Sequence, residues 1–189
     1  MSKIKLEPNA SGSGTLTIAA PNTNTDRTLS LPDNTGTILD TGNTAFFGAD
    51  WYVMTANNSS NGTKLTNWQN SLANSGKIGT GMSESSGTWT FPTTGIWWIY
   101  LGFRAEGAAT DNAFTAVELY TTPDDSTYTK AARAGIKVED EGVQAQQFMC
   151  FMFDVQDTSN YKCYYQSVLT GSNTILGSTT SPHTTVGFI

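Results

Sequence analysis

Short segments in which apolar and polar residues alternate follow one another along the chain, separated by Gly, Pro, Asn and Asp. From residue 46 onward this pattern predicts roughly eight to ten strands, spaced by about 8 to 12 residues, as in a β-sandwich or jelly roll. Residues 132–147 could be read as a helix, but Gly135 and Gly142 interrupt that pattern. We therefore predict strand, loop and strand there. The predicted strands include 51–55, 88–91, 95–107, 113–125, 128–138, 145–155, 160–169, 174–176 and 183–189.

Two of these strands, 95–107 and 145–155, carry apolar residues at odd and even positions alike. A strand with one face in water should alternate apolar with polar residues, so these two need cover on both faces. The sequence predicts no helix to provide it, and a further copy of the chain is the natural source. The candidate residues for contacts between copies are Ile96, Trp98, Tyr100, Phe148 and Met152.

Residues 1–45 differ from the rest, because no aromatic residue precedes Phe46. Their short alternating pieces bury too little apolar surface to offset a backbone ordering cost of about 1 to 2 kcal/mol per residue. The regular alternation favours pairing of this N-terminal segment with copies of itself or packing on another protein; disorder is the alternative. The domain boundary is predicted at 45/46, with a head at 46–189. The residues predicted to pack in the segment are Leu16, Ile18, Leu29, Leu31 and Ile38.

Composition and charge exclude several classes of protein. Only 14% of the residues are charged, and 10 Lys and Arg face 16 Asp and Glu, for a net charge of −6. Nucleic-acid binding is not expected, because it needs clustered cations. No apolar run reaches the roughly 18 to 20 residues of a membrane span, and the first residues lack a signal-peptide core, so we expect neither membrane insertion nor export. Without an oxidising compartment, Cys150 and Cys163 favour buried, reduced thiols; a disulfide is the alternative.

The segment GTWTFPTTGIWWIYLGF at 87–103 resembles a signature of the globular heads of complement's first component and of the tumour-necrosis-factor superfamily. Asn67-Trp68 upstream, the aromatic strands at 148–155 and 160–169, and the ending TTVGFI occur in the same order. The resemblance spans about residues 50–189. It implies a ten-strand jelly roll that trimerises about a three-fold axis through aromatic inner strands. That expectation agrees with the two strands that are apolar on both faces.

A second resemblance covers residues 14–39, which read GTLTIAAPNTNTDRTLSLPDNTGTIL. This stretch is similar, almost position for position, to segments of tail-fibre and other virion proteins of marine and cyanobacterial phages. Such segments imply a fibre shaft or an attachment to the virion ahead of a variable tip. The expected protein is therefore all-β and trimeric, assembled in the host cytoplasm and exposed on the particle surface.

Residues with catalytic or ligand-binding chemistry are few. His183 is the one histidine, and it lies in a Ser/Thr-rich turn where a surface or interface role is expected. The carboxylates at 124–125 and 139–141 could bind calcium, but they lack the spacing of a calcium loop and are expected to be solvated. We predict no catalytic residue, metal or cofactor. The tryptophans are expected in the core or between copies, and Tyr128 and Tyr161 are the better receptor-contact candidates.

Together these observations predict a homotrimeric short fibre or spike that adheres to a glycan or protein of the host surface. Its N-terminal segment would attach it to other virion proteins. Two alternatives stay open: a capsid decoration, cement or head-fibre protein without a receptor role, and a small glycan depolymerase or esterase of the tail.

Overall fold

The computed structural model describes residues 11, 13, 24, 49–108 and 113–189. The chain divides into two units, Met1–Leu39 and Asp40–Ile189, and the account below concerns the second. The predicted boundary at 45/46 lies outside the described residues. So do the five residues predicted to pack in the N-terminal segment, namely Leu16, Ile18, Leu29, Leu31 and Ile38.

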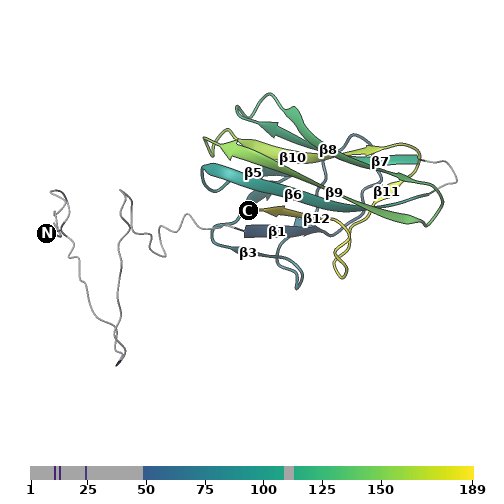
Figure 1. Ribbon diagram of the computed structural model, residues 1–189, viewed down its shortest axis with the longest axis horizontal. Helices are drawn as coiled ribbons and strands as arrows, with labels where there is room; N and C mark the ends of the chain where they lie inside the picture. Colours follow the sequence, from purple (N-terminus) through teal and green to yellow (C-terminus); the bar gives the residue numbers. More distant parts are fainter. Residues whose placement is uncertain (1–10, 12, 14–23, 25–48, 109–112) are drawn as a thin grey trace. The chain divides into compact units, whose positions relative to one another are not determined.

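The described residues form twelve strands and no helix, in two layers (Figure 1). The strands are β1 (Ala49–Met54), β2 (Trp68–Gln69), β3 (Gly76–Ile78), β4 (Ser83–Ser85), β5 (Thr88–Thr90), β6 (Gly95–Glu106), β7 (Ala113–Thr122), β8 (Thr129–Val138), β9 (Gln144–Val155), β10 (Lys162–Leu169), β11 (Thr174–Ile175) and β12 (Thr185–Phe188). The predicted all-β fold is confirmed.

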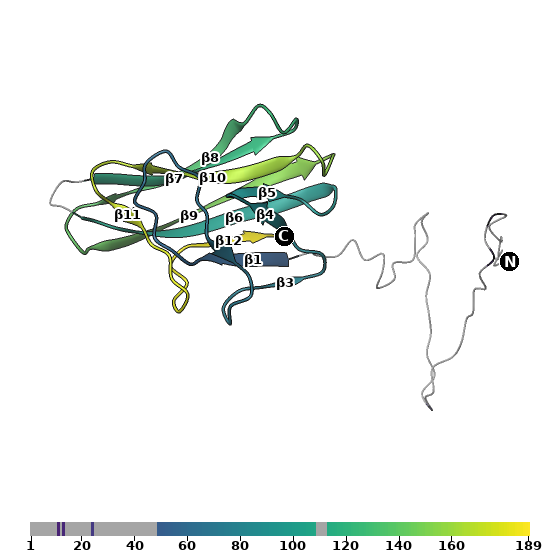
Figure 2. The same cartoon turned by 180° about the vertical axis from the view of Figure 1, so that it is seen from behind.

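Each layer is one antiparallel sheet, and the chain passes repeatedly from one to the other (Figures 1 and 2). In the first sheet, β9 pairs with β6, β6 with β12 and β11, β12 with β1, and β1 with β2 and β3. The second sheet has the order β4-β5-β10-β7-β8. Strands β5, β6 and β7 thus lie in the second, first and second sheet in turn. This alternation between two facing antiparallel sheets is the topology of a jelly roll.

Aromatic rings fill the space between the sheets. The Trp89 ring centroid lies 4.5 Å from that of Tyr52 and 4.9 Å from that of Phe188. Phe91 packs against Trp97 at 5.4 Å, so that rings from both sheets interlock. These tilted and edge-on arrangements are those that aromatic pairs prefer. Burial of Trp68, Trp89 and Trp97 confirms the expectation that most tryptophans lie in the core.

Strand β4 was not among the predicted strands, because its sequence is only Ser-Glu-Ser and has no apolar alternation. A tight turn places it beside β5: Ser86 and Gly87 both have positive φ, at 51° and 80°. Two such residues in succession make the turn that best joins twisted antiparallel strands. By contrast, residues 132–147 form the predicted strand, loop and strand, with β8 ending at Val138 and β9 beginning at Gln144.

A buried carboxylate joins β1 to the segment that leads into β4. Asp50 is only 2% exposed, and it accepts hydrogen bonds from the Tyr52 hydroxyl at 2.7 Å and the Met82 backbone N–H at 2.6 Å. The Asn70 amide donates a third, at 3.3 Å. Burial and the neighbouring Asp50 carboxylate raise the pKa of Tyr52, which therefore stays a donor. Asp50 thus anchors residues 70–82, which are mostly turn.

We predict that Asp50→Ala lowers the free energy of unfolding by about 2 to 3 kcal/mol, because it leaves several buried donors without an acceptor. Urea unfolding followed by tryptophan fluorescence measures the change. Tyr52→Phe, which removes one donor and keeps the acceptor, should cost less than Asp50→Ala. Equal stability of Asp50→Ala and the wild type would show that the carboxylate does not anchor this segment.

Candidate functional site

The outward face of the first sheet carries a cluster of apolar side chains at the β6–β9 pair. Register places Trp98 beside Met152, Tyr100 beside Cys150, and Gly102 beside Phe148. Trp98 also exchanges two backbone hydrogen bonds with Ile189, of 2.7 and 2.9 Å, which extends the face toward β12 and β1. We call this surface the apolar patch; its members are Ile78, Ile96, Trp98, Tyr100, Phe148, Cys150, Met152 and Ile189.

The five residues predicted for contacts between copies all lie in the apolar patch. Four of them are exposed: Ile96 to 73%, Trp98 to 51%, Phe148 to 65% and Met152 to 67%. Their odd-numbered neighbours on β6, such as Trp97 and Ile99, face the core and are buried. Tyr100, the fifth, is half-buried. The role of these residues in self-association stays a prediction.

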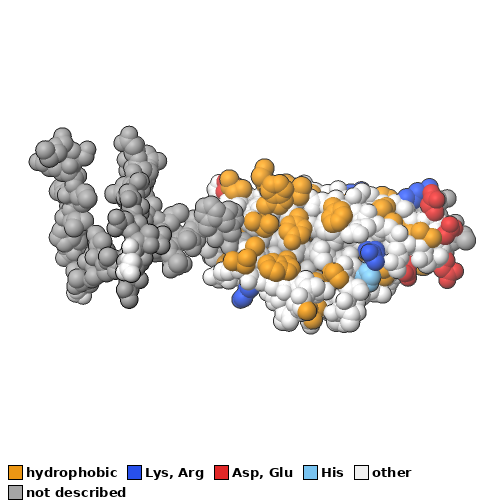
Figure 3. Space-filling model, turned by 60° about the horizontal axis from the view of Figure 1, so that its bottom comes forward, with side chains coloured by type: hydrophobic (Ala, Val, Ile, Leu, Met, Phe, Trp, Pro, Cys, Tyr) orange, Lys and Arg blue, Asp and Glu red, His pale blue; other side chains and the backbone are white. Residues whose placement is uncertain are grey.

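Two glycines let aromatic rings lie flat on this face. A Cβ at Gly187 would lie 2.1 Å from the Tyr100 ring, and a Cβ at Gly102 would lie 2.6 Å from the Phe148 ring. The rings therefore cover the backbone of the neighbouring strand, as aromatic residues do where a strand glycine leaves room. Burial of the Tyr100 ring raises the pKa of its hydroxyl. The result is an apolar surface on this half of the head (Figure 3).

Sequence reasoning missed two members of the patch, Ile78 (59% exposed) and Ile189 (46% exposed). Ile78 ends the three-residue strand β3, which is too short for a periodic signal. Ile189 follows β12, and the alternation of buried Val186 and Phe188 with Gly187 could have assigned it to the outward face.

The same sheet face becomes polar away from the apolar patch. Figure 3 shows hydrophobic side chains gathered on one half of the head, and charged ones toward the opposite end. There an Arg104 guanidinium nitrogen lies 3.1 Å from His183 Nδ1. Because a guanidinium can only donate, Nδ1 is the acceptor in this contact. His183 is half-buried on the surface, where a surface or interface residue was expected.

The two cysteines differ from each other. Cys163 on β10 is fully buried, as predicted, whereas Cys150 on β9 is exposed in the apolar patch, and the prediction of a buried thiol there was wrong. Cys150 occupies an even position of β9, and even positions face outward. Burial raises the pKa of the Cys163 thiol. Both cysteines are free.

The remaining chemical candidates serve local structure. The Asp124 carboxylate accepts hydrogen bonds from the backbone of Ser126 and Thr127 and from the Thr122 hydroxyl, and these bonds lower its pKa. Tyr161 packs against Phe153 at 5.5 Å, at the edge of the core. Within 49–108 and 113–189, no three His, Cys, Asp or Glu side chains could jointly hold a metal ion. The described residues also contain no helix that could span a membrane.

Comparison with solved structures supports the fold. The crystal structure of murine APRIL at pH 5.0 matches with a TM-score of 0.55 and 15% sequence identity, over 75% of this chain and 96% of that chain. The head therefore shares the jelly-roll fold of that structure. No protein-family model matches the chain, and no curated protein matches its sequence.

The exposure of Cys150 gives a probe for the apolar patch. We predict that a maleimide modifies one thiol per chain in dilute, folded protein, and a second only after unfolding, because maleimide reacts with thiolate and Cys163 is buried. Mass spectrometry counts the adducts. The Cys150→Ser variant should gain none while folded. Modification of Cys163 in the folded variant would contradict the arrangement of β10.

Proposed function

We propose that the chain self-associates through the apolar patch into a homotrimer, and that this trimer is the head of a short virion fibre or spike. The observation that carries the proposal is the exposed apolar surface of β6 and β9. Soluble monomers rarely leave so many large apolar side chains contiguous in water, and such surfaces commonly mark contacts between proteins.

The form of the patch favours copies of the same chain as its cover. Its side chains are all uncharged, so that equivalent surfaces can meet about a symmetry axis without repulsion between like charges. The sequence resemblance to heads that trimerise through aromatic inner strands supports three copies. The jelly-roll fold is consistent with that arrangement.

Attachment and adhesion complete the proposal. The phage-like stretch at 14–39 supports a role for the N-terminal segment in fastening the head to other virion proteins. Three equal sites on one trimer would convert weak contacts with a host-surface glycan or protein into stable adhesion. The proposed role is binding rather than catalysis. A capsid decoration or head-fibre role without a receptor is the alternative that the last experiment below separates from it.

We predict that Trp98→Asp abolishes assembly, because it places an unpaired carboxylate in the desolvated centre of the interface. Multi-angle light scattering should give the mass of three chains for the wild type and of one chain for the variant. Ser85→Asp, on the exposed edge of the second sheet, is the matched control and should remain trimeric. A monomeric wild type at micromolar concentration would overturn the proposed assembly.

Cys150 gives an independent readout of the same assembly. In the wild type, maleimide labelling of folded protein should slow as the concentration rises through the assembly range, because the interface covers the thiol. In Trp98→Asp the labelling rate should be independent of concentration. Equal rates at all concentrations in the wild type would place Cys150 outside the interface.

The virion role is tested on purified particles. Mass spectrometry should find the chain in the particle, and separation of tail from capsid locates it. Excess free trimer, or an antibody against the head, should block adsorption to the host. A particle-bound protein whose blockade leaves adsorption unchanged would support the decoration alternative instead.

A further inference from the structure

Cations are concentrated on the outward face of the second sheet. Five of the seven Lys and Arg in residues 49–189 lie there, although the chain as a whole is acidic. Register places Lys130, Arg133 and Lys137 of β8 beside outward residues of β7, and Lys162 occupies an outward position on β10. The fifth, Lys64, reaches the same face from the loop between β1 and β2, with its Nζ 4.4 Å from the centroid of the Tyr164 ring.

Tyrosines lie among these cations. The rings of Tyr120 and Tyr164 stack with centroids 5.0 Å apart and an interplanar angle of 11°. Tyr128 packs against Tyr164 at 4.9 Å. Tyr128 was one of the two sequence candidates for receptor contact, and the structure places it beside the Lys64 ammonium, at 5.6 Å. Half-buried rings with hydroxyls at the surface suit ligands that have both apolar and polar edges.

Carboxylates neutralise only part of this charge. Glu118 is 4% exposed, and its carboxylate lies 2.6 Å from Lys130 Nζ and 3.5 Å from Arg133 Nε. Desolvation opposes its ionisation, but hydrogen bonds from Lys130 and Tyr120 and both positive charges outweigh this and lower its pKa. Lys162 pairs with Asp125. Among the described residues, Lys64 has no carboxylate partner: its Nζ donates one hydrogen bond, to the neutral Thr88 hydroxyl at 2.8 Å, so its charge is not neutralised.

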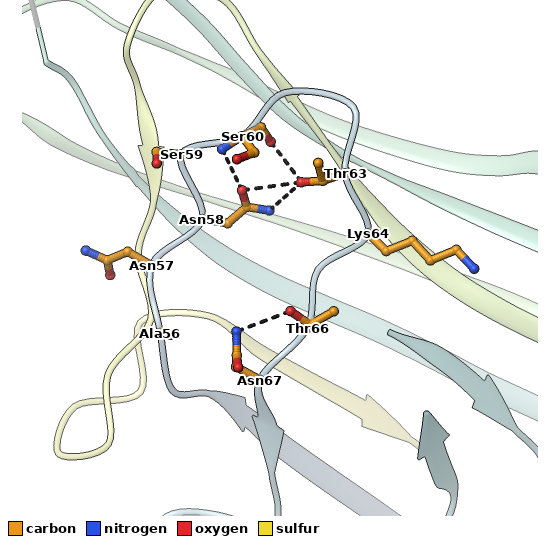
Figure 4. Close-up of a pocket in the computed structure, with 9 residues that line it drawn as sticks. All are labelled: Ala56, Asn57, Asn58, Ser59, Ser60, Thr63, Lys64, Thr66 and Asn67. Atoms are coloured by element: carbon orange, nitrogen blue, oxygen red, sulfur yellow. Dashed lines mark hydrogen bonds between the residues drawn. The ribbon is translucent and has the colours of Figure 1, made fainter. Parts of the chain in front are cut away.

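Lys64 also borders a polar hollow. The loop at 56–67 surrounds an open cavity of about 300 Å³, whose other lining residues are neutral. They are Ala56, Asn57, Asn58, Ser59, Ser60, Thr63, Thr66 and Asn67. Figure 4 shows the two limbs of the loop facing each other, with the Lys64 side chain extending away from the space between them.

The loop is held in place from both sheets. Asn58 pairs with Ile175 of β11, and Lys64 pairs with Gln166 of β10. Asn58 Oδ1 accepts a hydrogen bond from the Ser60 N–H at 2.8 Å, and the Thr63 hydroxyl donates to the Ser60 carbonyl at 3.0 Å. A site on this loop is therefore pre-formed, which reduces the ordering cost of binding.

The geometry points to a binding site for a carboxylate-bearing oligosaccharide, with the carboxylate on the Lys64 ammonium outside the hollow and the hydroxyls of an adjoining sugar on the amides and hydroxyls that line it. The adjacent Tyr128 and Tyr164 rings would contact the apolar edge of a neighbouring sugar. This inference rests on the adhesion part of the proposed function, for which it names the ligand class. The site faces away from the apolar patch and does not require assembly.

An acidic glycan fits this surface better than a nucleic acid does. A phosphate backbone carries a charge on every unit and requires a continuous row of cations. Here Lys130, Arg133 and Lys162 already have carboxylate partners, and Lys137 lies near the other end of β8, opposite Phe114. Lys64 is thus the cation beside the neutral, amide-lined hollow. That combination matches a ligand with sparse charge and many hydroxyls.

The test measures binding, by calorimetry, of a trisaccharide that carries a single galacturonic acid residue, with its methyl ester as the uncharged control. The acid should bind. The ester should bind at least about tenfold more weakly, because it cannot form the charge-assisted hydrogen bond. The affinity of the Lys64→Gln variant for the acid should fall by the same factor. Lys77→Gln, an equal charge change on the first sheet, should bind as the wild type does. Urea unfolding confirms that each variant folds.

Asn67→Gly tests the hollow itself. Asn67 has a φ of 63°, so glycine keeps the backbone and removes only the amide. This variant should bind the acid more weakly without changing the preference for acid over ester. Absence of acid binding by the wild type, equal weakening by Lys77→Gln, or equal binding of a trinucleotide would each overturn the inference.

Light scattering on the same samples separates the two proposals. If the protein is trimeric but binds no acidic sugar, only the proposed sugar site is refuted. If it is monomeric and binds the sugar, only the proposed trimer is refuted.

Discussion

The pairing of β6 with β9 determines which side chains build the core of the head and which form its apolar patch. The two strands match over twelve residue pairs, from Gly95 with Val155 to Glu106 with Gln144. Side chains of paired residues share a face, so apolar residues at successive positions are divided between the two sides of one sheet. One set, including Trp97 and Leu101, builds the sandwich core. Above the other set lies no layer formed by residues 49–108 or 113–189, and the apolar patch is the direct consequence.

Local periodicity was enough to predict the long strands and the direction in which their side chains face. It placed Ile96, Trp98, Phe148 and Met152 on a common face before any pairing was known, because a period of two determines the side of a strand. It failed where no period exists, as in the three polar residues of β4, and where a residue type suggested burial regardless of its position, as for Cys150. The N-terminal predictions fall on residues that the structure does not describe.

The cation and tyrosine cluster could not be predicted from the sequence, because its members come from three strands and two loops. Lys64 and Tyr164 are one hundred positions apart, and only the strand order β5-β10-β7-β8 brings them together. In the sequence the same lysines and arginine are isolated residues in an acidic chain, so the net charge alone predicts an acidic surface. The fold thus creates a local excess of positive charge that net charge conceals.

The sandwich separates the two surfaces by its own thickness, and that separation would allow the proposed assembly and the proposed sugar binding to occur together. If the first sheet is covered by neighbouring copies, the second sheet of every copy faces outward, with Lys64 and the tyrosines on it. The loop at 56–67 is bonded to β11 of the first sheet and to β10 of the second. Its position therefore depends on the packing of the two sheets against each other. Loss of that packing would disturb the sugar site without any change in the residues that form it.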